Sequence, residues 1–144
     1  MCYTDDMSEK AKTYCEKAGA IIVRDNKGKT EILLEYRERE YLRDWSFPKG
    51  GVEKSETPEE TTKREIREET GLEIELVRPL PEICYHNSHD GDVRVKMFLA
   101  RPTTENLRAE FDHDKVEWVT LNKVPEKLSY QNLRDYFKKV KKEL

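Results

Sequence analysis

The segment Gly50–Leu72 reads GGVEKSETPEETTKREIREETGL and carries the strongest local signals in the chain. Thr57 has the side chain of a helix N-cap, Pro58 suits the first helical turn, and Glu60 can close a capping box. Gly71 can end the same helix, because glycine accepts the left-handed conformation that often follows a last helical turn. These signals predict a helix between Thr57 and Gly71.

Three glutamates share one face of this expected helix. Glu65, Glu68 and Glu69 stand at positions i, i+3 and i+4, which places their side chains within roughly a 100° arc. Like charges at this spacing repel, and the neighbouring Arg64 and Arg67 offset the repulsion only in part. Mg²⁺ prefers carboxylate oxygens, so the cluster is a candidate metal site. A solvated acidic helix face is the alternative that the spacing alone leaves open.

The rest of the chain reads as strands and one more helix. Apolar and β-branched segments lie at 18–25, 31–36, 72–77, 92–100 and 115–121. The turn-rich stretch 25–29 and the pair Asp90-Gly91 predict hairpin turns. Ser129 can cap a final helix, on which apolar residues recur at three and four positions, namely Tyr130, Leu133, Phe137, Val140 and Leu144. This order predicts an α/β fold with a mixed sheet between helices.

Length and charge limit the class of protein. With 144 residues the chain has the size of one domain, and we expect an N-terminal arm or short helix over 1–16 before a domain over 17–144. Charged residues make up 40% and hydrophobic residues 35%, and no run approaches the about 20 apolar residues of a membrane span. The net charge of −3 excludes capture of nucleic acid by overall charge, so a polyphosphate must be held locally.

The cysteines and the N-terminus favour a cytoplasmic protein. Cys2, Cys15 and Cys84 lie far apart and form no CxxC pair, which is typical of a reduced compartment. We expect Cys84 to be buried on a strand. The first ten residues lack the basic and apolar regions of a secretory signal, and the three histidines have no spacing typical of zinc ligands.

The helix and its flanks follow a known motif. The motif fixes the residue type at nine positions, which in this chain are Gly50, Glu56, Arg64, Glu65, Ile66, Glu68, Glu69, Gly71 and Leu72. They match the complete Nudix box, GX5EX7REUXEEXGU with U aliphatic, so the chain resembles the Nudix hydrolases. The resemblance implies an α/β/α sandwich, a Mg²⁺ (or Mn²⁺) cofactor and hydrolysis of a phosphoanhydride.

The resemblance also gives expected roles to residues of the box. Glu65, Glu68 and Glu69 resemble the metal ligands of the family, and the backbone carbonyl of Gly50 is free of steric hindrance for the same purpose. Arg64 and Glu56, eight residues apart, resemble the ion pair that ties the preceding loop to the helix. We count the three glutamates, Arg64 and Glu56 as candidate catalytic residues, and Gly50 as a candidate metal ligand.

Outside the box, WSFPKGGVEKSE resembles the diadenosine tetraphosphate hydrolase branch, in which W-G-F-P-K-G-x-x-E-x-G-E is typical. Ser46 and Ser55 replace glycines of that pattern. Asp112-His113 precede Trp118 where the branch often has Glu-His, which makes Asp112 a candidate metal ligand or general base. An ordinary acidic loop residue is the alternative.

Four further residues are candidates for substrate binding. The resemblance places Lys49 and Lys96 over the polyphosphate, although each is also compatible with a solvated surface lysine. Tyr85 and Tyr130 can hold an adenine between their rings, since base stacking contributes roughly 1–3 kcal/mol. Both tyrosines are equally compatible with core packing.

The predicted reaction is asymmetric cleavage of diadenosine tetraphosphate to ATP and AMP, and other readings remain. The same box serves ADP-ribose or other nucleotide sugars, diphosphoinositol polyphosphates, damaged nucleoside triphosphates and RNA 5′ ends, of which RNA is not favoured. A non-catalytic nucleotide sensor would be expected to carry a broken box, and an isomerase to carry further Cys and Glu motifs. The expected partner is a small polyphosphate nucleotide, with no membrane; the sequence leaves the oligomeric state open.

Overall fold

The computed structural model describes residues 13–144 of the chain. Its longer elements are the strands β1 to β7 and the helices α1 to α3, in the order β1 (Cys15–Asn26), β2 (Lys29–Arg39), β3 (Leu42–Ser46), β4 (Lys49–Gly51), α1 (Pro58–Thr70), β5 (Ile74–Asn87), β6 (Gly91–Pro102), β7 (Lys115–Thr120), α2 (Val124–Lys127) and α3 (Gln131–Val140). Short 3-10 turns precede α2, at Leu121–Lys123, and follow α3, at Lys141–Glu143.

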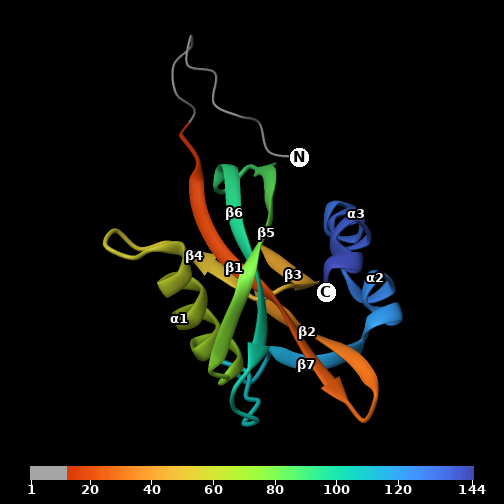
Figure 1. Ribbon diagram of the computed structural model, residues 1–144. Helices are drawn as coiled ribbons and strands as arrows, with labels where there is room; N and C mark the ends of the chain where they lie inside the picture. Colours follow the sequence, from red (N-terminus) through yellow and green to blue (C-terminus); the bar gives the residue numbers. More distant parts are fainter. Residues whose placement is uncertain (1–12) are drawn as a thin grey trace.

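The seven strands form one mixed sheet. Its order is β3-β2-β1-β6-β5, with β4 paired to β1 and β7 paired to β2. Strands β1 and β6 run parallel, whereas the other pairs are antiparallel. Helix α1 lies on one side of the sheet, and α2 and α3 lie on the other side (Figure 1). The predicted α/β/α sandwich with a mixed sheet is confirmed.

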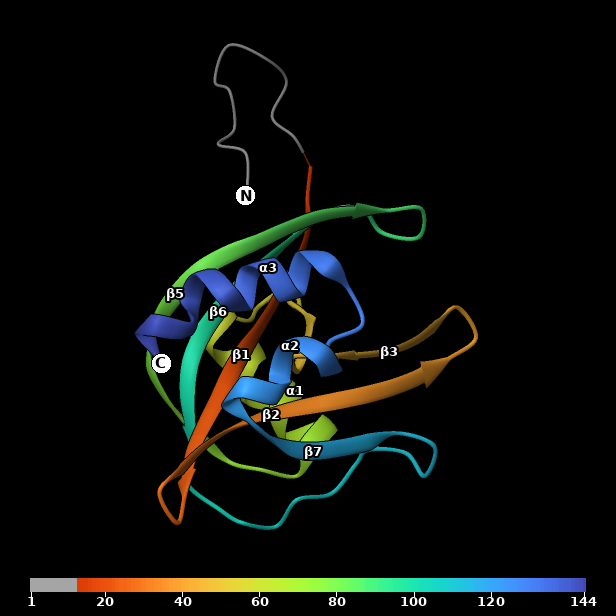
Figure 2. The ribbon, with the colours of Figure 1, turned by 90° about the vertical axis from the view of Figure 1, so that its right-hand side faces the viewer.

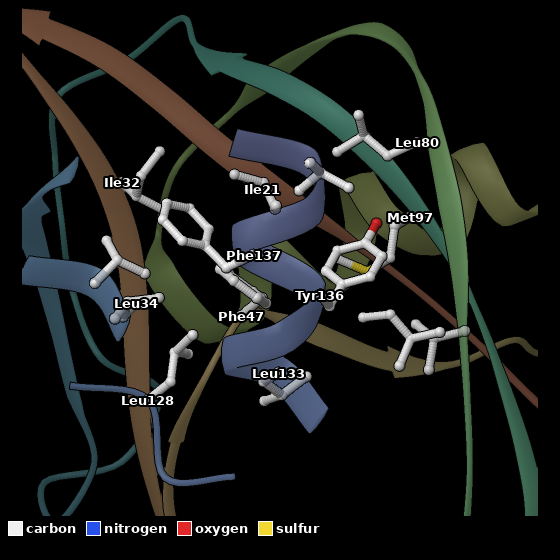
Figure 3. Packing of buried hydrophobic residues seen from close by; sticks show 14 of the residues in the cluster. Ile21, Ile32, Leu34, Phe47, Leu80, Met97, Leu128, Leu133, Tyr136 and Phe137 are labelled. Carbon is white, nitrogen blue, oxygen red and sulfur yellow. The ribbon is translucent and has the colours of Figure 1, made fainter. Parts of the chain in front are cut away.

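Each face of the sheet has its own apolar core. Ile21 and Val23 of β1 belong to the core beneath α3, where Phe137 packs against Phe47 (Figure 3). Ala20 and Ile22, on the opposite face of the same strand, belong to the core that includes Ile66 of α1. Alternate residues of a strand point to opposite faces, so the continuous apolar run 20–23 reflects a strand covered on both sides.

Helix α1 begins and ends as the sequence predicts. The side chain of Thr57 accepts from the backbone N–H of Glu60, and the Glu60 carboxylate accepts from the N–H of Thr57, at 3.1 and 2.9 Å. Gly71 follows the helix with φ of +78°, a left-handed conformation that glycine adopts without strain. Both ends of the acidic helix are therefore set by local sequence.

Both predicted hairpin turns are present. Asn26 pairs with Lys29, and the two residues between them have positive φ, 52° at Lys27 and 84° at Gly28. This backbone matches the twist of an antiparallel pair. Gly91, with φ of 75°, likewise follows the turn between β5 and β6.

Strand β5 is longer than predicted, because the expected segment ends at residue 77. It continues through Pro79 and Pro81 to Asn87, with register shifts between Leu76 and Arg78 and between Leu80 and Ile83. Prolines are tolerated because β5 is the last strand in the sheet order and the ladder is irregular there.

The start of the final helix also differs from the prediction. Helix α3 begins at Gln131 with Tyr130 at the N-cap, and Ser129 does not cap it. Instead the Ser129 hydroxyl accepts a hydrogen bond of 2.8 Å from the backbone N–H of Trp45. Leu133, Phe137 and Val140 are buried as expected, whereas Tyr130 is exposed.

Three expectations concern the N-terminal arm, Cys84 and membrane-spanning helices. Residues 1–12 of the predicted arm lie outside the described residues, and β1 begins at Cys15. Cys84 is half-buried and disulfide-bonded, which corrects the expectation of a fully buried thiol outside any disulfide. Within residues 13–144, no helix has the length and apolar character to cross a membrane.

Candidate active site

Arg64 ties the loop before α1 to the helix. Its Nε donates to Glu56 Oε2 at 2.6 Å and its Nη2 donates to Glu56 Oε1 at 2.9 Å. Nη2 also reaches the carbonyl of Gly51 at 3.2 Å. The hydrogen bonds from Arg64, with one from the Thr61 hydroxyl, lower the pKa of Glu56 to about 2. Glu56 is thus an ionised anchor for the loop that leads into the helix.

The same guanidinium contacts two of the three clustered glutamates. Arg64 Nη1 donates to Glu65 Oε1 at 2.9 Å and to Glu68 Oε1 at 3.1 Å. The Glu65 side chain is largely buried, whereas the Glu68 side chain is 47% exposed. Among the described residues, no three His, Cys, Asp or Glu side chains already stand together as a ligand set. Ligation by both glutamates would therefore require their bonds to Arg64 to loosen.

Gly50 lies directly against Glu65. A Cβ at Gly50 would overlap the Glu65 carboxyl group, whereas a Cβ at Gly51 would meet no atom within 4 Å. The close approach places the backbone of β4 beside a carboxylate of α1. A backbone carbonyl and a carboxylate are both oxygen donors of the kind that Mg²⁺ prefers.

Glu69 is buried against a second carboxyl group, that of Glu35 on β2. The two residues are 4% and 2% exposed and lie within hydrogen-bonding reach of each other. Burial, and next the charge of Glu35, raise the pKa of Glu69 above its ordinary value, and burial likewise raises the pKa of Glu35. Arg37 Nη1 lies 3.5 Å from Glu69 Oε2.

This pair lacks compensating donors. Oε1 of Glu35 and Oε1 of Glu69 are buried without a hydrogen-bond partner among the described residues. Buried carboxylates are stable when they are paired or when they bind a metal. The residues present therefore fit a divalent cation, with Glu69 and Glu65 as carboxylate donors and Gly50 as a carbonyl donor.

A cleft of about 1100 Å³ opens beside these groups. Glu65, Glu69, Gly50 and Lys49 line it from α1 and β4, and Lys17 of β1 is also part of its lining. Further lining residues come from the β2–β3 turn, the β5–β6 turn and the start of α3. Figure 2 shows the β2–β3 and β5–β6 turns extending to the same side of the molecule.

Three of the four predicted substrate contacts line this cleft: Lys49, Tyr85 and Tyr130. Tyr130 is 45% exposed, and its hydroxyl donates to Asp44, which raises the pKa of Tyr130 to about 12. Tyr85 is half-buried; burial raises its pKa, and Lys17 hydrogen-bonds its hydroxyl. Burial lowers the pKa of Lys49.

Five predicted site residues are not among those that line the cleft, namely Glu56, Arg64, Glu68, Lys96 and Asp112. Lys96 is half-exposed on β6 and lies 3.4 Å from Glu82 Oε2. Asp112 is exposed in the loop before β7. The structure brings Gly50, Glu65 and Glu69 of the box around one cleft with Lys49 and both tyrosines, and the other five predicted residues lie outside its lining.

Sequence reasoning missed the cleft residues of the strands. Arg37, Arg39 and Asp44 line the cleft, and Glu35 lies behind Glu69. The sequence held one signal for them. Polar residues interrupt or directly follow the apolar run 31–36, which belongs to a strand covered on both faces. Such residues are functional candidates because burial of an ionisable group requires a partner.

Comparisons with known proteins agree with this arrangement. The family model described as NUDIX domain matches residues 14–140. An 8-oxo-(d)GTP phosphatase of Mycolicibacterium smegmatis is 30% identical over 138 residues, which cover 90% of this chain and 42% of that protein. An RNA pyrophosphohydrolase of Nitratiruptor sp. is 28% identical over 152 residues, which cover 89% of this chain and 96% of that protein.

Among solved structures, the binary complex of an Ap4A hydrolase of C. elegans superposes with a TM-score of 0.75. It is 22% identical, and the match covers 90% of this chain and 99% of that chain. This likeness concerns the fold. The chain spans about two fifths of the length of the M. smegmatis relative, so the activity of that longer protein is not transferred by the match.

Proposed function

The chain belongs to the Nudix family of hydrolases, and from this premise we propose that it hydrolyses a phosphoanhydride in a nucleoside diphosphate-linked compound. The proposed substrate is diadenosine tetraphosphate, cleaved asymmetrically to ATP and AMP. One observation carries the proposal: Gly50, Glu65 and Glu69 border a single cleft that also presents basic and aromatic side chains. Such a cleft suits a substrate that joins a polyphosphate to a base.

Mg²⁺ or Mn²⁺ is the proposed cofactor. Glu65, Glu68, Glu69 and the carbonyl of Gly50 would hold it, with Asp112 as a further candidate ligand. The buried, unpartnered Oε1 of Glu69 supports this assignment. A bound divalent ion polarises phosphate oxygens and lowers the pKa of the water that attacks phosphorus.

Residues of the chain would orient the substrate around this centre. Lys49 can stabilise negative charge that develops on the polyphosphate, because a fixed cation favours a charged transition state. Tyr85 and Tyr130 can hold an adenine by stacking. Lys96 is proposed for parts of the substrate beyond the cleft lining. Glu65 and Asp112 are both proposed as candidates for the general base, and Glu65 is the one that borders the cleft.

Product analysis with a substrate panel tests the proposal. Diadenosine tetraphosphate, ADP-ribose, 8-oxo-GTP, a diphosphoinositol polyphosphate and RNA with a 5′ triphosphate are each incubated with protein and millimolar Mg²⁺. We expect ATP and AMP from the first substrate, with the highest kcat/KM, and no turnover in the presence of a chelator. A tenfold higher kcat/KM on another substrate would reject diadenosine tetraphosphate and leave the hydrolase proposal standing.

Glu69→Gln separates catalysis from simple nucleotide binding. The change removes one negative charge from the site, and we expect kcat to fall by roughly 10³-fold, about 4 kcal/mol in the barrier. A wild-type protein that binds nucleotides but turns over none of the panel would instead identify a sensor. Asp112→Asn tests the base, since general base catalysis contributes about 10²–10⁴-fold, and a loss below about threefold would favour Glu65.

A further inference from the structure

Glu35 is a buried acid outside the motif that carries the proposed chemistry. It lies on β2, paired with Ser46 of β3 and Val116 of β7, and only 2% of it is exposed. Leu33, two residues earlier, packs in the core beneath α1, so Glu35 points to the same face of the sheet. That face carries Glu69, a buried carboxylate that is a proposed ligand of the cation.

Glu35 approaches Glu69 from the side of the sheet. Glu69 lines the cleft, whereas Glu35 is absent from the lining, so Glu35 lies behind Glu69 as viewed from the cleft. The two carboxyl groups are within hydrogen-bonding reach, and the Oε1 atom of each remains without a partner among residues 13–144. A packing role alone does not account for an acid at this position, because an apolar residue would fill the same space without a desolvation penalty.

Nearby cations do not balance the charge of the glutamates. Arg37 Nη1 lies 3.5 Å from Glu69, but Arg37 Nε is itself buried without a hydrogen-bond partner. Lys49 contributes a favourable charge near Glu35. Glu65 adds a third carboxyl group, and its partner Arg64 is shared with Glu56 and Glu68. Acids therefore outnumber bases around the site, and the low dielectric of the interior strengthens their attraction for a divalent cation.

We propose that Glu35 is a positioning residue for divalent cation binding, which fixes the Glu69 carboxylate from behind and increases the cation affinity of the site by its own charge. This inference rests on the proposed function, because it assumes that Glu69 binds the cation. Groups that orient a metal ligand from behind contribute to affinity although they do not touch the metal. Glu35 would thus extend the metal site from α1 into the central sheet.

Mn²⁺ binding to the full chain without substrate, measured by calorimetry, tests the inference. Glu35→Gln keeps the shape of the side chain and removes its charge, and we expect the Kd for Mn²⁺ to rise by about 10–100-fold. Glu75→Gln makes the same charge change at an exposed position of β5 and is expected to bind Mn²⁺ as the wild type does. Equal Mn²⁺ affinity of wild type and Glu35→Gln would overturn the proposal.

Thermal unfolding gives a second readout that a purely structural role would not reproduce. Without metal, Glu35→Gln should unfold at the same or a higher temperature than the wild type, because one buried negative charge is removed. The increase in Tm on adding Mn²⁺ should shrink in this variant. A lower metal-free Tm together with an undiminished increase from Mn²⁺ would identify Glu35 as structural only.

Two outcomes separate this inference from the proposed function. A wild-type chain that binds no Mn²⁺ would contradict the proposed cofactor, whereas a binding wild type with an equally binding Glu35→Gln contradicts the role of Glu35 alone. If Glu35→Gln does not fold, Glu35→Asp replaces it. The shorter side chain withdraws the carboxylate from Glu69, and we expect at least a threefold rise in Kd; an unchanged Kd would reject the inference.

Discussion

Gly50 and Gly51 are neighbours that differ in their tolerance of a side chain. Gly50→Ala should displace the Glu65 carboxyl group, which its Cβ would overlap, whereas Gly51→Ala has open space and serves as the matched control. A displacement of about 1 Å in an active site can cost about 10²-fold in rate. We therefore expect kcat/KM to fall by roughly 10²-fold for Gly50→Ala and to stay near wild type for Gly51→Ala. Equal activity of the two variants would contradict the role of the close approach.

Tyr130 contributes a ring and a hydroxyl with separable effects. Its hydroxyl donates to the buried Asp44, so Tyr130→Phe should lower the free energy of unfolding by about 1 kcal/mol through loss of this hydrogen bond. Tyr130→Phe keeps the stacking surface, and KM should change little. Tyr130→Ala should raise KM by the equivalent of about 1–3 kcal/mol. Urea unfolding and steady-state kinetics on both variants check this, and an equal KM for Phe and Ala would exclude stacking.

At the scale of single residues, the motif residues were easier to identify than the residues that contact them from neighbouring strands. Glu65 and Glu69 could be selected because spacing along a helix is a local property. Glu35 was harder to select, since an acid that interrupts the run EILLEY is equally compatible with a solvated position on a strand. Its burial depends on β3 and β7, which pair on either side of β2 and come from distant parts of the chain. That information is absent from local sequence.

Helix α1 gains stability from the Glu56–Arg64 pair, and its contribution should depend on pH. The folded pKa of Glu56 is about 2, below its ordinary value of 4.5. A depressed pKa means that the ionised form is favoured by folding, so the stabilisation is present above about pH 4.5 and is lost as pH falls towards 2. The difference in urea midpoint between wild type and Glu56→Gln should be constant from about pH 5 to 7 and shrink below about pH 4.5.

The exposed Glu59, in the first turn of the same helix, provides the control. Glu59→Gln makes the same charge change, and Arg64 makes no hydrogen bond to Glu59 among those described. We expect a smaller effect on the urea midpoint at neutral pH. A midpoint difference for Glu56→Gln that persists unchanged at about pH 2.5 would show that the ion pair is not its source.

Whole elements were predictable where their signals are local. The ends of α1 follow from Thr57, Glu60 and Gly71, whose side chains and backbone act within one helical turn. The sequence predicts too short a strand for β5 because Pro79 and Pro81 normally interrupt a strand. The position of β5 at the edge of the sheet explains why both prolines are tolerated. The structure therefore differs from the prediction at those ends of helices and strands that depend on tertiary position.

At the scale of the molecule, the cleft depends on pairings that the sequence did not predict. Strand β1 contacts β6 in parallel register from Cys15 with Val93 to Ile22 with Ala100, and β4 adds to its other side. These pairings bring the β5–β6 turn to the same cleft as β4 and α1. Parallel contacts between distant strands have no local signature, so the mixed sheet was predictable as a class but its order was not.

Arg39 joins the loop before β7 to the cleft, and its loss should release that loop. Nη1 and Nη2 donate to the two carboxylate oxygens of Asp114 at 2.7 and 3.0 Å, and Asp114 has a side chain only 6% exposed. We expect Arg39→Ala to lower the free energy of unfolding by about 1–3 kcal/mol, because Asp114 loses the side chain that donates hydrogen bonds to both of its carboxylate oxygens. Hydrogen exchange should accelerate in residues 110–114, which include the candidate base Asp112, and stay unchanged in α3.

Arg43→Ala is the matched control, because it removes the same charge at an exposed position of β3 and should leave exchange in the loop unaltered. Unchanged protection of residues 110–114 in Arg39→Ala would mean that the Arg39–Asp114 contact does not hold the loop that carries Asp112.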